Sequence, residues 1–231
     1  ASPVSSAAST AAESTTSSVV SEATSAAADE NAAAAAQLLN DLTGSYQELW
    51  PVILADEYKQ TWLDDCTALV GEDNAEAAFE KLSSMVTGDV YGEDAVKAYA
   101  NGGGAYFCGF TNDLATLTFD GETSTISGTD KDGNELFSHP YHYIGMEPVR
   151  GLYEFESDDA DSGEFTYFFL APDTSAETYH IEFRYGSDAD ALSQYDAGDY
   201  AYWLASGIST DCDQTMIDNC IELFCTENLA G

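Results

Sequence analysis

Apolar positions divide the chain into a helical half and a strand half. In residues 74–86 they recur every three or four positions, which places Ala78 and Leu82 on one face and predicts an amphipathic helix. Residues 92–100 predict a second such helix. The glycine-rich residues 101–104 then end the helical half, because glycine is a poor helix former.

Two further helical regions frame these helices. Upstream, Trp50-Pro51 is expected to break a short helical stretch, since proline lacks the N–H that a helix interior needs. Near the end, residues 209–225 predict a closing helix with Ser209 or Thr210 as its N-cap. The apolar face predicted for it comprises Met216, Ile217, Cys220, Ile221 and Phe224.

After residue 104 the spacing of apolar positions changes to two, which is typical of strands with one buried face. Eight aromatic and β-branched runs follow at about ten-residue spacing, separated by Asp and Gly turns. The runs are residues 105–111, 114–120, 123–129, 134–140, 141–146, 150–156, 164–172 and 178–185. This pattern predicts an α+β fold, mostly β, built on an antiparallel barrel or sandwich.

The first 37 residues have a different composition. Residues 1–37 hold 27 Ala, Ser or Thr and no aromatic residue, so they cannot bury enough apolar surface to offset the entropy of ordering. We interpret them as a disordered tether. The alanines at 32–36 predict a helix that begins inside the end of the tether and packs through Leu38, Leu39 and Leu42.

The chain is strongly acidic. Six Lys and Arg against 42 Asp and Glu give a net charge of −36, which repels nucleic acid and favours a soluble monomer. No run approaches the roughly 20 apolar residues that span a bilayer. The Ser/Thr/Ala tail and the scarcity of lysine are typical of an exported bacterial surface protein, so we expect an extracellular or cell-surface location, with room for a lipid anchor before Ala1.

Five cysteines are too few for a disulfide scaffold in a chain of 231 residues, and none forms a Cys-x-x-Cys pair. In an oxidising compartment one or two disulfides could form, and the odd number leaves at least one thiol over. Whether Cys66 pairs with Cys108 stays open at this level. Cys220 and Cys225 lie five apart on a predicted helix and point in different directions, which argues against a bond between them.

Three histidines carry the candidate chemistry. His180 and Glu182 stand two apart in a predicted strand, so their side chains share a face and could reach one cation. His139 and His142 lie three apart and would face opposite sides of a strand, so one at most can support such a site, and His142 is the better candidate. No calcium loop, phosphate loop or nucleophile motif is present in the sequence, and we expect a binding protein rather than an enzyme.

The order of these segments resembles the ZinT family of calycin-like zinc-binding domains. The resemblance covers residues 38–226, and its most specific features are Trp50-Pro51, Ala171-Pro172 and the strand that ends at Gly186. It implies a calycin or lipocalin-like antiparallel barrel with flanking helices over 38–231. It also implies capture of zinc under scarcity and delivery to an ABC importer.

The resemblance further implies where zinc would bind. The family's ligands are a histidine just before the Ala-Pro dipeptide and a His-x-His pair on the next strand, whereas this chain has Phe168, His180 and Glu182 at those positions. Two outcomes are open. In one, His180, Glu182 and a third group such as His142 bind zinc or another divalent cation. In the other, a metal-free barrel serves as a surface module that binds a partner.

Overall fold

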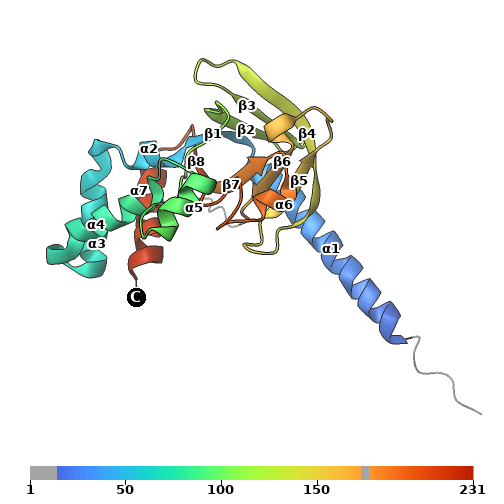
Figure 1. Ribbon diagram of the computed structural model, residues 1–231, viewed down its shortest axis with the longest axis horizontal. Coiled ribbons are helices and arrows are strands. Elements are labelled where there is room, and N and C mark those ends of the chain that lie inside the picture. Colours follow the sequence, from blue (N-terminus) through green and yellow to red (C-terminus); the bar gives the residue numbers. More distant parts are fainter. Residues whose placement is uncertain (1–14, 173–176, 231) are drawn as a thin grey trace, which may run out of the picture.

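The computed structural model describes residues 15–172 and 177–230. Eight antiparallel strands close into a barrel in which each strand pairs with the next and β8 pairs with β1 (Figure 1). The strands are β1 (Gly44–Glu48), β2 (Thr116–Asp120), β3 (Thr125–Thr129), β4 (Glu135–Met146), β5 (Tyr153–Ser157), β6 (Tyr167–Leu170), β7 (His180–Gly186) and β8 (Ala205–Ser209). The α+β barrel predicted from the sequence is confirmed.

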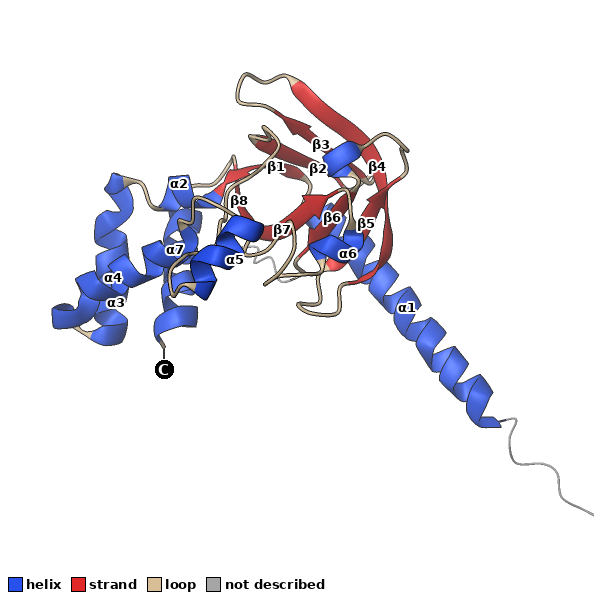
Figure 2. Ribbon diagram, in the orientation of Figure 1, coloured by secondary structure: helices blue, strands red, loops and turns tan. Residues whose placement is uncertain are grey.

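Helices lie around the barrel, as the colouring by secondary structure shows (Figure 2). They are α1 (Thr15–Asp41), α2 (Leu49–Ile53), α3 (Lys59–Val70), α4 (Glu72–Val86), α5 (Glu93–Ala100), α6 (Ala189–Leu192) and α7 (Gln214–Leu229), with 3-10 turns η1 (Asp56–Tyr58) and η2 (Gly163–Phe165). Among the described residues, no helix has the length and apolar character needed to cross a membrane.

The strand count matches the prediction, but two of the eight strands differ. Residues 105–111 form no strand beyond isolated bridges at Phe107, and β1 and β8 were not predicted. Both missed strands are five residues long, and they pair with each other across most of the chain, at Tyr46↔Ser209. Short runs of this kind carry little periodic signal.

Strand β4 joins two predicted strands into one of 12 residues. Its first half pairs with β3 up to Pro140, and its second half pairs with β5 from Tyr141 onward. Pro140 has no N–H to donate, and it stands at the end of the β3 ladder, where a missing donor is least costly. His139 therefore lies within a strand.

Aromatic side chains fill the interior of the barrel. Phe168 on β6 is fully buried, with its ring centre 5.3 Å from that of Tyr185, 6.4 Å from Phe183, 5.5 Å from Tyr141 and 5.8 Å from Phe137. These partners come from β7, which pairs with β6, and from β4, which lies beyond β5. Residues of the sheet that alternate with them face outward.

A layer of helices covers the outer face of β8 on one side of the barrel (Figure 1). Trp62 of α3 is fully buried there and donates its indole N–H to the carbonyl of Ile53, at 2.7 Å. Pro51 lies in the first turn of α2, where proline is tolerated, so Trp50-Pro51 starts a helix and does not break one. The closing helix α7 is capped by Asp213, whose side chain accepts from the backbone N–H of Met216, and not by Ser209 or Thr210.

Helix α1 extends away from the barrel at one end and packs against it at the other (Figure 1). Leu38, Leu39 and Leu42 are buried in the barrel core, as the sequence predicted, and so is Ala35. The helix differs from the prediction in starting at Thr15, well before the alanines at 32–36, and an Ala-rich composition favours such an extension. Residues 1–14 of the predicted tether lie outside the described residues.

Candidate metal site

His180 and Glu182 lie on the outer face of β7. Burial alternates over the first four residues of the strand, with Ile181 and Phe183 in the barrel core and His180 and Glu182 half-buried on the other side. Their direct partners on β8 are Ile208 and Ser206. The prediction that the two side chains share one face is confirmed by this register, since alternate residues of a strand point the same way.

A threonine orients the imidazole. The buried Thr178 places its hydroxyl oxygen 2.6 Å from Nδ1 of His180. When Nδ1 carries the proton and donates it to this hydroxyl, the lone pair of the ring lies on Nε2. A hydrogen bond of this kind fixes the orientation of the ring, as the outer partners of ligating histidines do in metal sites.

Glu182 lines a cavity on the outside of the barrel. The cavity has a volume of about 320 Å³. It is lined by Arg150, Leu152, Ala171, Pro172, Glu182 and Leu204. The Ala171-Pro172 dipeptide follows β6, and the backbone N–H of Ala171 donates to the carbonyl of Glu182 at 2.9 Å. This contact places the end of β6 beside the candidate acidic ligand.

The charge of Glu182 contributes to raising the pKa of two buried thiols, Cys108 and Cys220. Burial and, after it, the charge of Glu182 raise the pKa of Cys108 to about 12. Burial also raises the pKa of Cys220 to about 12, with smaller contributions from Cys212 and Glu182. Both thiols are therefore protonated at neutral pH in the metal-free protein.

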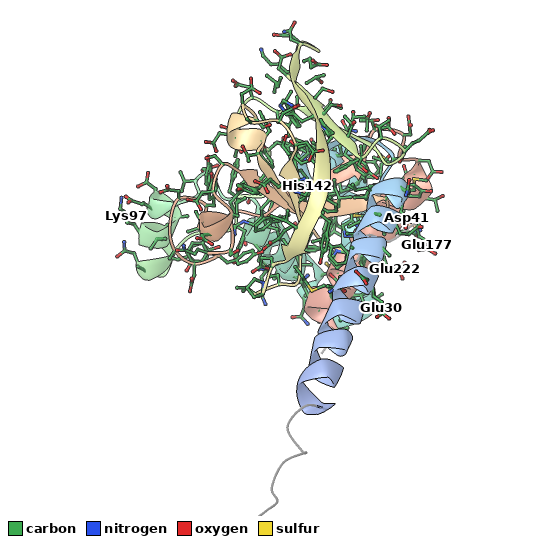
Figure 3. All side chains as sticks on the ribbon, turned by 90° about the vertical axis from the view of Figure 1, so that its right-hand side faces the viewer. Glu30, Asp41, Lys97, His142, Glu177 and Glu222 are labelled. Carbon is green, nitrogen blue, oxygen red and sulfur yellow. The ribbon has the colours of Figure 1, made fainter. Side chains whose placement is uncertain are left out.

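His142 lies elsewhere on the barrel. It belongs to β4, which is separated from β7 by β5 and β6. Its Nδ1 is 2.7 Å from a carboxylate oxygen of Asp158, and its Nε2 is 3.9 Å from one of Glu156. Figure 3 shows His142 on the β4 ribbon and Glu177, which precedes β7, on opposite sides of α1. The structure thus keeps His142 apart from His180.

The described residues contain no group of three or more His, Cys, Asp or Glu side chains placed to hold a metal ion. His180, Glu182 and His142 are all described, so the structure does not bring these three together. His139 also has its own partner, since its Nδ1 lies 2.7 Å from a carboxylate oxygen of Asp159. Of the three residues that the sequence proposed, His180 and Glu182 therefore stay together on one face of β7, and His142 lies apart.

Phe168 does not stand beside this pair. It pairs with Tyr185 in the sheet, and both rings point into the barrel interior. His180 and Glu182 point to the opposite face of the same sheet. A histidine at position 168 would face the aromatic core, so the expectation that Phe168 fills the place of a missing ligand is not met in this fold.

Sequence reasoning missed the basic side chains around the cavity. Arg150 and Arg184, the two arginines of the chain, lie over the Tyr195 ring at 4.8 and 4.3 Å from its centre. Arg184 is fully buried, which lowers its pKa, and it donates to the backbone carbonyls of Leu192, Gln194 and Tyr200. These bonds hold the segment after α6 against β7. The signal available in the sequence was the position of Arg184 between two aromatic residues of a predicted strand, in a chain with only two arginines.

Glu147 completes this network. It is fully buried and accepts hydrogen bonds from the backbone N–H groups of Val149 and Arg150, at 2.6 and 2.7 Å. The hydroxyl of Tyr195 lies 3.3 Å from the same carboxylate. Together these bonds shape the β4–β5 turn that forms one wall of the cavity.

Comparison with known proteins gives a result at the level of structure. No protein-family model and no curated protein matches the chain. The Zn(II)-bound ZinT-like domain of Streptococcus pneumoniae AdcA matches with a TM-score of 0.50 and 15% identity, over 80% of this chain and 89% of that one. Zn(II)-bound AdcA from the same organism matches with a TM-score of 0.47 and 13% identity, over 81% of this chain and 35% of its own. The protein therefore has the fold of a ZinT-like calycin domain.

Proposed function

We propose that the protein binds a divalent cation, with zinc as the preferred ion, at a site centred on His180 and Glu182. The observation that carries the proposal is the orientation of His180 by Thr178 on the same face of β7 as Glu182. Imidazole nitrogen and carboxylate oxygen are both zinc donors. The Zn(II)-bound ZinT-like domain of similar fold supports this choice of ion.

The donor set fits a cation site only in part. Among the described residues, His180 and Glu182 supply one imidazole and one carboxylate, so we expect weaker binding than at a site with three imidazoles. A carboxylate also shifts the preference toward harder ions than an all-imidazole set would. When bound, the ion would be cargo that the protein holds and releases, and no catalytic step is required of it.

The cellular role follows from the family resemblance. We propose that the protein is exported, captures zinc outside the cell and passes it to an ABC importer. Its net charge of −36 would raise the local concentration of cations around such a site. Exposed carboxylates include Glu30 and Asp41 of α1, Glu177 before β7 and Glu222 of α7, which Figure 3 labels.

Equilibrium dialysis against Zn²⁺ in excess Mg²⁺, followed by metal analysis, tests the site. We expect about one zinc ion per chain that Mg²⁺ does not displace, because imidazole prefers zinc to magnesium. His180→Ala and Glu182→Gln should each remove this ion. His142→Ala is the matched control, since it removes an imidazole from the β4 face and should leave the stoichiometry unchanged.

Loose binding of many ions that His180→Ala does not change would mean that only the polyanionic surface binds zinc. That result would overturn the proposal. Retention of the fold in each variant is checked by circular dichroism, so that loss of zinc is not confused with unfolding.

A second candidate is a metal-free barrel that binds a partner protein. Apolar side chains on and beside the end of β4 favour it, since Ile144, Met146 and Val149 are 40%, 43% and 64% exposed. Exposed apolar residues that cluster can mark interaction sites. Stoichiometric zinc that depends on His180 would count against this alternative.

A further inference from the structure

Two cysteines far apart in the sequence meet in the helical layer. Cys66 of α3 and Cys225 of α7 are fully buried, and their Sγ atoms lie 4.0 Å apart. Cys66 therefore has Cys225 as its neighbour, in place of the Cys108 partner that the sequence left open. The helices also meet through aromatic rings next to the thiols, with Trp62 and Phe224 at 6.0 Å between centres.

Like charges line the same helix interface. Burial, and then the charges of Glu222 and Asp218 on α7, raise the pKa of Asp65 on α3. Asp65 directly precedes Cys66. At neutral pH the acidic side chains of the two helices therefore repel each other beside the thiol pair.

We propose that Cys66 and Cys225 form a disulfide that fastens α3 to α7. The bond would close a loop that contains the whole barrel except β1. It would hold the two helices together against the repulsion of their carboxylates. The helical layer that covers the outer face of β8, next to β7, would then be covalently fixed.

The oxidant is a disulfide-carrying compound, either a small-molecule disulfide or a thiol–disulfide oxidoreductase. The thiolate of one cysteine attacks the disulfide of the oxidant, which forms a mixed disulfide and releases one thiol. The thiolate of the second cysteine then attacks the first sulfur, and the second thiol of the oxidant leaves. Two electrons and two protons pass from the cysteines to the oxidant.

Burial of the two thiols determines when the disulfide can form. Burial raises the pKa of the Cys66 thiol, and burial together with the charge of Cys66 raises that of Cys225. A thiol that stays protonated and inaccessible reacts slowly, so the bond should form during folding, before the helices close. Once formed, it should resist reductant in the native protein and yield to it only in denaturant.

The test uses the full chain, denatured and reduced, then refolded in a mixture of oxidised and reduced glutathione. Thiols are alkylated in denaturant and counted by mass spectrometry. We expect three of the five cysteines to be alkylated. Digestion with trypsin and a glutamate-specific protease should yield residues 60–72 cross-linked to residues 223–227, which contain Cys66 and Cys225 and no other cysteine.

Two variants sharpen the result. Cys108→Ser should keep the cross-link, because Cys108 is not part of the pair, whereas Cys66→Ser should leave all four remaining cysteines open to alkylation. The oxidised wild type should also melt roughly 5–10 °C above the reduced protein. Alkylation of all five cysteines after oxidative refolding, or a cross-link that leaves Cys66 and Cys225 alkylated, would overturn the proposal.

Discussion

Replacing Phe168 by histidine tests whether position 168 belongs to the aromatic core or to the candidate metal site. The substitution places an imidazole where sequence comparison with the ZinT family expects one. In the structure, however, position 168 faces the aromatic interior, and His180 faces the other side of the sheet. We therefore expect Phe168→His to destabilise the protein without strengthening zinc binding.

The cost follows from the surroundings of Phe168. The ring is fully buried, and the hydroxyls of its neighbours Tyr141 and Tyr185 are already bonded to Phe165 and Thr111. A buried imidazole there would lose the packing of the phenyl ring and leave its nitrogens without good partners. We expect a loss of ~4 kcal/mol of unfolding free energy, and a fall in Tm of roughly 8–16 °C.

Urea denaturation and zinc titration of the same samples measure both effects. Phe168→Leu is the matched control, and it should lose only ~1–2 kcal/mol because it keeps an apolar side chain of similar volume. Suppose instead that Phe168→His gains zinc affinity of about tenfold or more, and that His180→Ala removes the gain. Positions 168 and 180 would then share a site, and the assignment of the two faces of the sheet would be refuted.

Three further predictions address packing and charge. Gly121→Ala should loosen the docking of α1, because a Cβ at this position would lie 2.4 Å from Cα of Asn40. Limited proteolysis should then cleave α1 faster than in the wild type, and an equal rate of cleavage would contradict this prediction. Tyr185→Phe should cost ~1–3 kcal/mol in urea denaturation, since its hydroxyl accepts from the N–H of Thr111 at 2.6 Å and donates to the carbonyl of Thr111 at 2.9 Å; an unchanged midpoint would argue against these bonds. The pKa of Asp65 is raised in the folded state. Ionisation of Asp65 therefore lowers the free energy of unfolding as the pH rises from the ordinary pKa of aspartate through the raised one. Asp65→Asn should therefore stabilise the protein at pH 7 and have little effect at about pH 3.5, and an equal effect at both pH values would exclude this cause.

The sequence could place candidate site residues together only where they lie on the same strand. Residues that stand two apart on a strand share a face, so the sequence predicts that His180 and Glu182 lie on one face of β7, and the structure places them there. The role of Thr178 was not visible, because its contact with His180 depends on how the chain enters β7. The separation of His142 from the pair depends on the order of strands around the barrel, which spacing does not reveal.

The neighbours of the cysteines show the same limit. The spacing of Cys220 and Cys225 along one helix argues against a disulfide between them. No pattern in the neighbouring sequence indicates that Cys225 lies beside Cys66. That contact arises because α3 and α7 bury their apolar faces against each other.

The sequence by itself determined the strand-rich, aromatic character of the domain, the helical segments before residue 101, and the shared face of His180 and Glu182. Each of these depends on the period of apolar side chains along a single element. Only the tertiary structure decided that β1 closes the barrel against β8 and that Phe168 points inward while His180 points outward. Such outcomes depend on pairing between distant segments, and the energy that selects them comes from burial of the whole core and not from any local pattern.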